Sequence, residues 1–141
     1  MARKKIIAYR NFANKVWNAA RFVLANREIR NSKFEIRNFL HKDDLWILEE
    51  TKKTVKKVTN FIEKYRFDLA AEEIYQFFWH TFCDKYIEMS KKRRKEAQPT
   101  LAYVLETSLK LLHPFMPFIT EEIWQMLPGK RKPLIISPWP K

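Results

Sequence analysis

The sequence of 141 residues contains one cysteine and one glycine, and these two shortages exclude several kinds of protein. With Cys83 alone, no internal disulfide can form. A single glycine, Gly129, leaves no glycine-rich phosphate loop and few sites for tight turns. The sequence also has no signal peptide and no apolar stretch of about 18 residues, so we expect a cytoplasmic protein with no membrane partner.

Aromatic residues are abundant, with five tryptophans and eleven phenylalanines, and hydrophobic residues make up 46% of the chain. This composition excludes a disordered chain, and together with the shortage of glycine it favours long helices. A chain of 141 residues fits one domain, whose hydrophobic core needs no metal or disulfide. The prediction is a single domain over residues 1–141, an all-α bundle of about five helices with a short extended C-terminal tail.

The net charge is +12, from 28 Lys and Arg against 16 Asp and Glu. Such a charge attracts a polyanion over long range, because neutralised phosphates release condensed counterions. Nucleic acid is the natural partner for this charge, and a basic soluble protein with another partner is the alternative.

Hydrophobic periodicity, together with acidic, proline and glycine signals at the ends, predicts where the helices lie. Asp43 or Asp44 suits the start of the second helix, Asp68 is a candidate N-cap of the third, and Pro99 suits the first turn of the fourth. The expected helices cover residues 2–26, 43–64, 68 to the cationic run at 91–95, 99–113, and 117 to the turn at Gly129. Residues 27–40 are expected to form a loop, and 134–139 an extended tail.

The first predicted helix has an apolar and a polar face. The expected core stripe consists of Tyr9, Phe12, Ala13, Val16, Ala20 and Val23. The opposite face carries Arg10, Asn14, Asn18 and Arg21, with Phe22 exposed on its flank. Guanidinium and amide groups can contact phosphates and base edges, and a phenylalanine can stack on an unpaired base. This face is therefore a candidate RNA contact, with an ordinary solvated face as the alternative.

The cationic run at residues 91–95 is a second candidate for contact with RNA. Lys91, Lys92, Arg93 and Arg94 could hold phosphates, and such contacts position an RNA without reading its sequence. The alternative is a solvated helix end, because a run of like charges repels itself.

No catalytic centre or metal site is predicted. His41, His80 and His113 lack the spacing of metal ligands, and no cysteine pair accompanies them. No Ser/His/Asp set offers itself, and Asp84 and Glu88, one helical turn apart, are better explained by a surface ion network with nearby cations.

Three blocks carry a resemblance to a known family. They are residues 112–125 (LHPFMPFITEEIWQ) with the tail IISPWP at 135–140, residues 10–23 (RNFANKVWNAARFV), and residues 67–88, which begin FDLAA and end CDKYIE. Their order and sequence resemble the anticodon-binding domain of valyl-tRNA synthetases, within the class I group of aminoacyl-tRNA synthetases. The resemblance extends over residues 9–140, nearly the whole chain.

The resemblance implies a helical bundle that binds tRNA, specifically tRNA(Val). In this family the first bundle helix lies beside the anticodon, which implies Asn14, Asn18 and Arg21 as contacts. One position departs from the family, because Lys85 stands where the family usually has a tryptophan on the core-facing side of the third helix. Either this corner is exposed here or the packing differs.

The resemblance also implies that catalysis belongs to a separate Rossmann-like domain with His-Ile-Gly-His and Lys-Met-Ser-Lys-Ser motifs, which this sequence lacks. The isolated chain is therefore expected to be a monomeric recognition module, excised from or corresponding to the C-terminal region of a synthetase, and not an enzyme. No cofactor is expected in it, although the full-length enzymes use ATP and magnesium, and the catalytic domain of the same synthetase is an expected partner. The same domain of an isoleucyl, leucyl or methionyl enzyme and a basic helical protein-interaction module are the alternatives.

Overall fold

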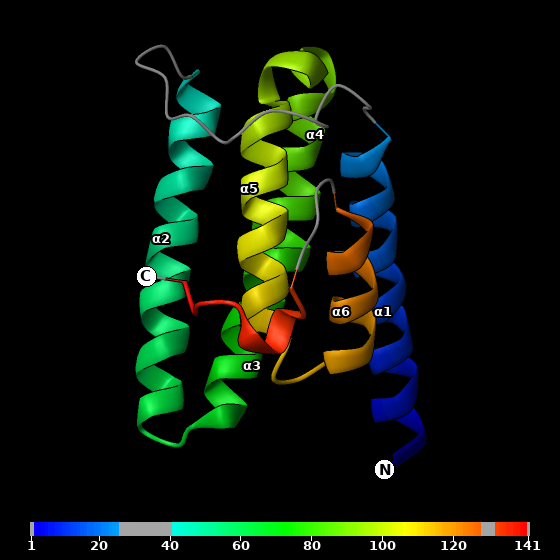
Figure 1. Cartoon of the computed structure of the whole chain (residues 1–141), viewed down its shortest axis with the longest axis vertical. Coiled ribbons are helices and arrows are strands. Elements are labelled where there is room, and N and C mark those ends of the chain that lie inside the picture. Colours follow the sequence, from blue (N-terminus) through cyan, green and yellow to red (C-terminus); the bar gives the residue numbers. More distant parts are fainter. Residues whose placement is uncertain (1, 26–40, 128–131, 141) are drawn as a thin grey trace.

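The computed structural model describes residues 2–25, 41–127 and 132–140, with side chains from Ile7 onward. Within these ranges the chain is helical and contains no strand, which confirms the predicted all-α bundle. Figure 1 shows long helices that run side by side, with α6 lying between α5 and α1. The expected loop at residues 27–40 and the glycine turn at Gly129 lie outside the described residues.

The predicted first, second and fifth helices agree with the structure to within a few residues. The elements are α1 (Ala2–Leu24), α2 (Lys42–Glu63), α3 (Phe67–Gln76), the π-helix η2 (Phe77–Ile87), α4 (Glu88–Ser90), the 3₁₀ turn η3 (Lys91–Arg93), α5 (Arg94–Leu112), α6 (Pro117–Met126) and the 3₁₀ turn η4 (Leu134–Ile136). From α3 to η3 the helical segments follow one another directly, so they form one long rod.

Two predicted helix starts are wrong. α5 begins at Arg94, so Pro99 lies within the helix and not in its first turn. The early start is favoured because Ala97 is buried, and Gln98 reaches another helix by a hydrogen bond. Asp68 is not the N-cap of α3 but a first-turn residue, where its carboxylate faces the positive end of the helix dipole and pairs with Arg66 at 3.2 Å.

The start of α2 is capped by a residue that the sequence did not indicate. His41 precedes the helix, and its Nδ1 accepts a hydrogen bond from the backbone N–H of Asp43 at 3.1 Å. Asp43 and Asp44 then occupy the first turn, near the positive end of the helix dipole. The start of α6 follows the prediction, since Pro117 occupies its first turn, where a missing N–H is harmless.

The hydrophobic core is centred on η2 and α5. The helical period over residues 99–113 predicts an inward apolar stripe on α5, and its members are all buried, namely Leu101, Val104, Leu105, Leu109 and Leu112. In η2 the buried residues come in adjacent pairs, at 77 and 78, 82 and 83, and 86 and 87. Because a π-helix has a wider turn than an α-helix, this pairing buries a broad face, whereas a regular α-helical period predicts a single apolar stripe.

At three positions the observed exposure bears on the predicted core. Tyr9 belongs to the predicted core stripe of the first helix, and a regular helical period places Met89 on the apolar face of the third helix, but both side chains are exposed. Tyr9 lies near the start of α1, and Met89 lies beyond the π-helix, where the wider turn has rotated the apolar face. Lys85 is exposed, which resolves the departure from the family: this corner of the rod faces solvent.

Cys83 lies in the core on η2. Burial raises the pKa of its thiol to about 12, since the charged thiolate is poorly solvated there.

The C-terminal tail crosses the bundle from α6 to α2 (Figure 1). It is not wholly extended as expected, because η4 forms a turn at its start. Three hydrogen bonds fasten it: Leu134 N–H donates to Glu121 at 2.7 Å, Trp124 Nε1 donates to the carbonyl of Lys132 at 3.0 Å, and Trp139 Nε1 donates to Thr59 at 2.8 Å. The tail thus packs as part of the bundle.

Candidate nucleic-acid interface

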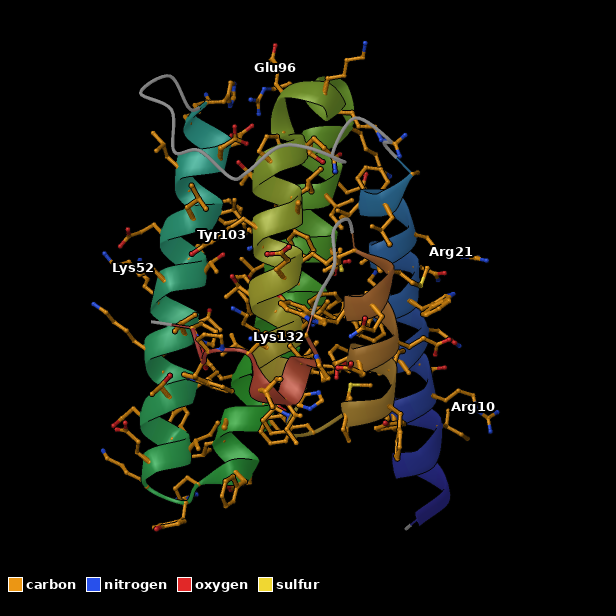
Figure 2. All side chains as sticks on the ribbon, in the orientation of Figure 1. Arg10, Arg21, Lys52, Glu96, Tyr103 and Lys132 are labelled. Atoms are coloured by element: carbon orange, nitrogen blue, oxygen red, sulfur yellow. The ribbon has the colours of Figure 1, made fainter. Side chains whose placement is uncertain are left out.

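The polar face of α1 is exposed as predicted. Arg10, Asn14, Asn18 and Arg21 are spaced by four, four and three residues and all lie at the surface. Residues at these spacings share one side of an α-helix, so the four side chains form a line along it. Figure 2 shows Arg10 and Arg21 projecting from the side of α1 that points away from the rest of the bundle.

The side chains of this line are not engaged by the described part of the protein. Within it, none of the four forms a hydrogen bond or an ion pair with another side chain. Two guanidinium groups and two amides therefore keep their donors and acceptors available to a ligand. We call Arg10, Asn14, Asn18 and Arg21 the α1 polar line.

Contacts on the other side of α1 fix the direction in which the line points. Val16 and Val23 are fully buried, and the ring of Phe12 lies 4.8 Å from that of Tyr75 between ring centroids. These contacts set the rotation of α1 about its axis, and with it the outward direction of the α1 polar line.

An ion network joins α1 to η2 beside the line. Lys15 Nζ lies 3.3 Å from Asp84 Oδ1 and 5.3 Å from the centre of the Trp79 ring, and His80 Nδ1 lies 3.1 Å from Asp84 Oδ2. Burial acts to raise the pKa of Asp84, but the hydrogen bonds from His80 and Lys15 outweigh it and hold that pKa below its usual value. Asp84 thus belongs to a surface ion network, as the sequence predicted.

Phe22 is placed differently from the prediction. Its side chain is half-buried against the core, and the guanidinium carbon of Arg94 lies 4.6 Å from the centre of its ring. The helical pattern of α1 alone predicts an exposed ring, because the residue that covers it, Arg94, lies 72 positions away in the sequence. Only part of the ring is accessible.

The cationic run at residues 91–95 is largely engaged with the protein itself. Lys91 Nζ lies 2.7 Å from Glu88 Oε1, Arg93 pairs with Asp44, and Arg94 donates to the carbonyl of Phe22 at 3.1 Å. Lys92 is exposed and has no such partner among the described residues. The run is thus a set of separate local interactions and not one open basic patch.

Arg93 belongs to a buried network and not to the surface expected from the sequence. Its Nη2 lies 3.1 Å from Asp44 Oδ2, and the hydroxyl of Tyr86 donates to Asp44 Oδ1 at 2.6 Å. The side chains of Arg93 and Asp44 are 17% and 2% exposed. The hydrogen bond with Asp44 raises the pKa of Arg93, while burial and the same carboxylate raise the pKa of Tyr86. The network joins the start of α2 to η2 and η3.

The described residues offer no group that would hold a metal ion, since no three His, Cys, Asp or Glu side chains cluster among them. Among these residues, no helix has the length and hydrophobicity needed to cross a membrane.

Comparison with known proteins gives consistent results. The sequence pattern of a family described as "Anticodon-binding domain of tRNA ligase" matches residues 44–141. The chain is 50% identical over 138 residues to a valine–tRNA ligase of Pseudothermotoga lettingae, which covers 94% of this chain and 16% of that protein. Similar proteins include the valine–tRNA ligases of Thermotoga maritima (51% identical, 95% of this chain, 16% of that protein) and Listeria innocua (41%, 98% and 17%).

The chain thus spans about one sixth of the length of these curated relatives. The family match covers more than half of the chain, from α2 to the C-terminal tail, while the relatives also cover most of the rest. This chain belongs to the family of anticodon-binding domains of tRNA ligases.

Proposed function

We propose that this chain binds the anticodon arm of tRNA(Val) and acts as the recognition module of a valine–tRNA ligase. The observation that carries the proposal is the α1 polar line, which presents two guanidinium and two amide groups without partners among the described residues. The name of the relatives supports valine over isoleucine, leucine or methionine, since each of those cited is a valine–tRNA ligase.

The two kinds of side chain have different tasks in this proposal. Arg10 and Arg21 neutralise phosphates, which supplies affinity and holds the RNA in register without reading its sequence. Asn14 and Asn18 offer donors and acceptors to the edges of unpaired bases, and the accessible part of the Phe22 ring contacts a base face. Sequence reading is thus assigned to the middle of the α1 polar line and electrostatic attraction to its two ends.

The module contributes binding energy and not chemistry. The ligase reaction takes place in a separate catalytic domain, which uses ATP and magnesium, and the chain itself holds no cofactor. Binding of the anticodon arm here orients the acceptor end of the tRNA at that remote centre. The expected partners are tRNA(Val) and the catalytic domain of the same ligase, and the expected setting is the cytoplasm, with the isolated chain a monomer.

The test is a set of affinities at several salt concentrations for a valine tRNA and for a copy with an exchanged anticodon. The expected result is tighter binding of the valine tRNA, on top of a salt-dependent component common to both. Equal affinity for both RNAs at every salt concentration would mean that the module positions tRNA without reading the anticodon. Tighter binding of an isoleucine, leucine or methionine tRNA would reassign the module to that enzyme, and binding of neither RNA would favour a protein-interaction module.

A further inference from the structure

The last turn of α1 is held by two side chains from α5. A helix leaves its final carbonyl groups without partners in the helix. At the end of α1, the N–H of Ala25 satisfies Arg21 O at 2.9 Å, whereas the next two carbonyls are satisfied from outside. Arg94 Nη2 donates to Phe22 O at 3.1 Å, and Gln98 Nε2 donates to Val23 O at 2.9 Å.

Arg94 and Gln98 reach α1 together because they are one turn apart on α5 and so lie on the same side of that helix. Gln98 is buried, which fixes its amide, and the cation of Arg94 lies at the negative end of the α1 dipole. The two residues therefore attach α1 to α5 at one point.

Arg94 contacts both the backbone and the side chain of Phe22. Its guanidinium group lies over the ring at 4.6 Å while one of its nitrogens bonds the carbonyl of the same residue. The planar guanidinium presents several donors in a rigid fork, so a lysine at this position, with one compact ammonium, is not an equivalent. This double contact fixes the ring of Phe22 and the turn that carries Arg21.

We propose that Arg94 is a positioning residue for RNA binding, and not a phosphate contact: it holds the last turn of α1 so that Arg21 and Phe22 meet the RNA in one orientation. The inference rests on the proposed function, because it concerns the same face of α1. The charge of Arg94 alone would suggest a phosphate contact. Its neighbour Lys92 fits that role better, because it is exposed and has no partner among the described residues.

The two tasks differ in how affinity depends on salt. A phosphate contact contributes about 0.7 to 0.9 to the slope of log affinity against log salt, and a lysine can replace an arginine there. A positioning residue contributes nothing to the slope, and the exchange of arginine for lysine is harmful. Arg94→Lys, Arg94→Gln and the matched control Lys92→Gln therefore separate the two tasks.

The experiment measures binding of an anticodon stem-loop RNA with a valine anticodon to the whole chain and to these variants. For Arg94→Lys we expect affinity to fall about tenfold with an unchanged salt slope, corresponding to loss of one charge-assisted hydrogen bond and of the ring contact. Arg94→Gln should behave in the same way. Lys92→Gln should instead reduce the salt slope by about 0.7 to 0.9, the contribution of one phosphate contact. If Arg94→Lys binds like the parent and Arg94→Gln flattens the slope as Lys92→Gln does, Arg94 is a phosphate contact and the inference is wrong.

A double-mutant cycle with Phe22→Leu separates positioning from a general loss of stability. Phe22→Leu removes the ring contact but keeps the backbone carbonyl, so Arg94→Lys should cost less affinity in the Phe22→Leu protein than in the parent, while additive losses would contradict the inference. The cycle is repeated with RNAs that lack one loop base at a time. At one loop position the loss caused by Arg94→Lys should disappear, whereas a structural defect would weaken every RNA alike. If the parent binds no RNA at all, the proposed function itself fails; if it binds and the cycle is additive, only the inference fails.

Discussion

The sequence predicts two surfaces for RNA contact, the outer face of α1 and the cationic run at residues 91–95. In the folded protein the two differ in how many of their side chains are bound to other residues. The side chains of the α1 polar line have no partner among the described residues, whereas Lys91, Arg93 and Arg94 are bound to Glu88, Asp44 and Phe22. The density of positive charge along a sequence therefore does not measure how much of it is offered to RNA. A charged side chain is available to RNA only when it is not already paired with another group of the protein.

The largest expected effect tests whether Arg93 is structural. Asp44→Ala leaves the Arg93 guanidinium, 17% exposed, with Glu96 as its only carboxylate partner among the described residues, at 3.3 Å from Arg93 Nε. It also removes the acceptor of the Tyr86 hydroxyl. Because a largely buried cation loses its buried partner and a buried hydroxyl loses its acceptor, we expect the free energy of unfolding to fall by about 3 kcal/mol. Urea denaturation followed by circular dichroism measures it, with Glu49→Ala, an exposed carboxylate on the same helix, as the control. Equal urea midpoints for the two variants would show that the contact between Arg93 and Asp44 does not stabilise the fold.

The next effect concerns the end of the α1 polar line. Arg21→Ala is expected to weaken binding of tRNA by about 1 to 3 kcal/mol while leaving stability unchanged, because the side chain is exposed and supports no described contact. A filter-binding titration measures the affinity, and a thermal melt of the same sample provides the stability. Unchanged affinity together with intact helicity would remove Arg21 from the interface.

A smaller effect concerns selectivity within the same line. Asn14→Ala combined with Asn18→Ala should narrow the difference in affinity between a valine tRNA and its anticodon-swapped copy by about 1 kcal/mol, since neutral amides contribute to base recognition and not to attraction of phosphates. The salt slope should stay that of the parent. Should the double variant instead weaken both RNAs equally, the amides position the RNA, and the contrast between the ends and the middle of α1 would disappear.

The smallest effect depends on pH. The pKa of Asp84 is lowered in the folded protein, so its ion pair stabilises the fold above the ordinary pKa of a carboxyl group, and this stabilisation is lost as pH falls through the lowered value. Asp84 is 45% exposed, so solvent screens the gain. Asp84→Asn should lower the thermal midpoint slightly at pH 7, and the difference from the parent should shrink as pH falls through the lowered pKa of Asp84. Glu122→Gln replaces an exposed carboxylate and is the control, and its effect on the thermal midpoint should not depend on pH in this way. A midpoint difference that persists unchanged in acid would show that the hydrogen bonds, not the charge, matter.

Features set by local sequence were predictable. The start of α6 at Pro117 and the apolar stripe of α5 depend on residues a few positions apart, and both were predicted correctly. The outward face of α1 was also predicted, because helical period alone determines which side chains oppose the core.

Features set by distant partners were not predictable. Asp44 and Arg93 are 49 positions apart, and Phe22 and Arg94 are 72 apart, so no pattern within one helix shows that they meet. The π-helical turn of η2 is a third case, since it widens a helix whose sequence fits a regular period nearly as well. The early start of α5 depends in the same way on the burial of Ala97 and on the bond from Gln98 to α1.

The buried thiol in η2 gives the protein a built-in reporter of its own opening. The thiolate is the form that attacks alkylating reagents, and a thiol with a pKa of about 12 is almost wholly protonated at neutral pH and is shielded by the core. Cys83 is the only cysteine in the sequence, so a label on a thiol must be on Cys83. The rate of labelling therefore measures how often the centre of the bundle opens, with and without RNA, and no probe has to be added to the chain.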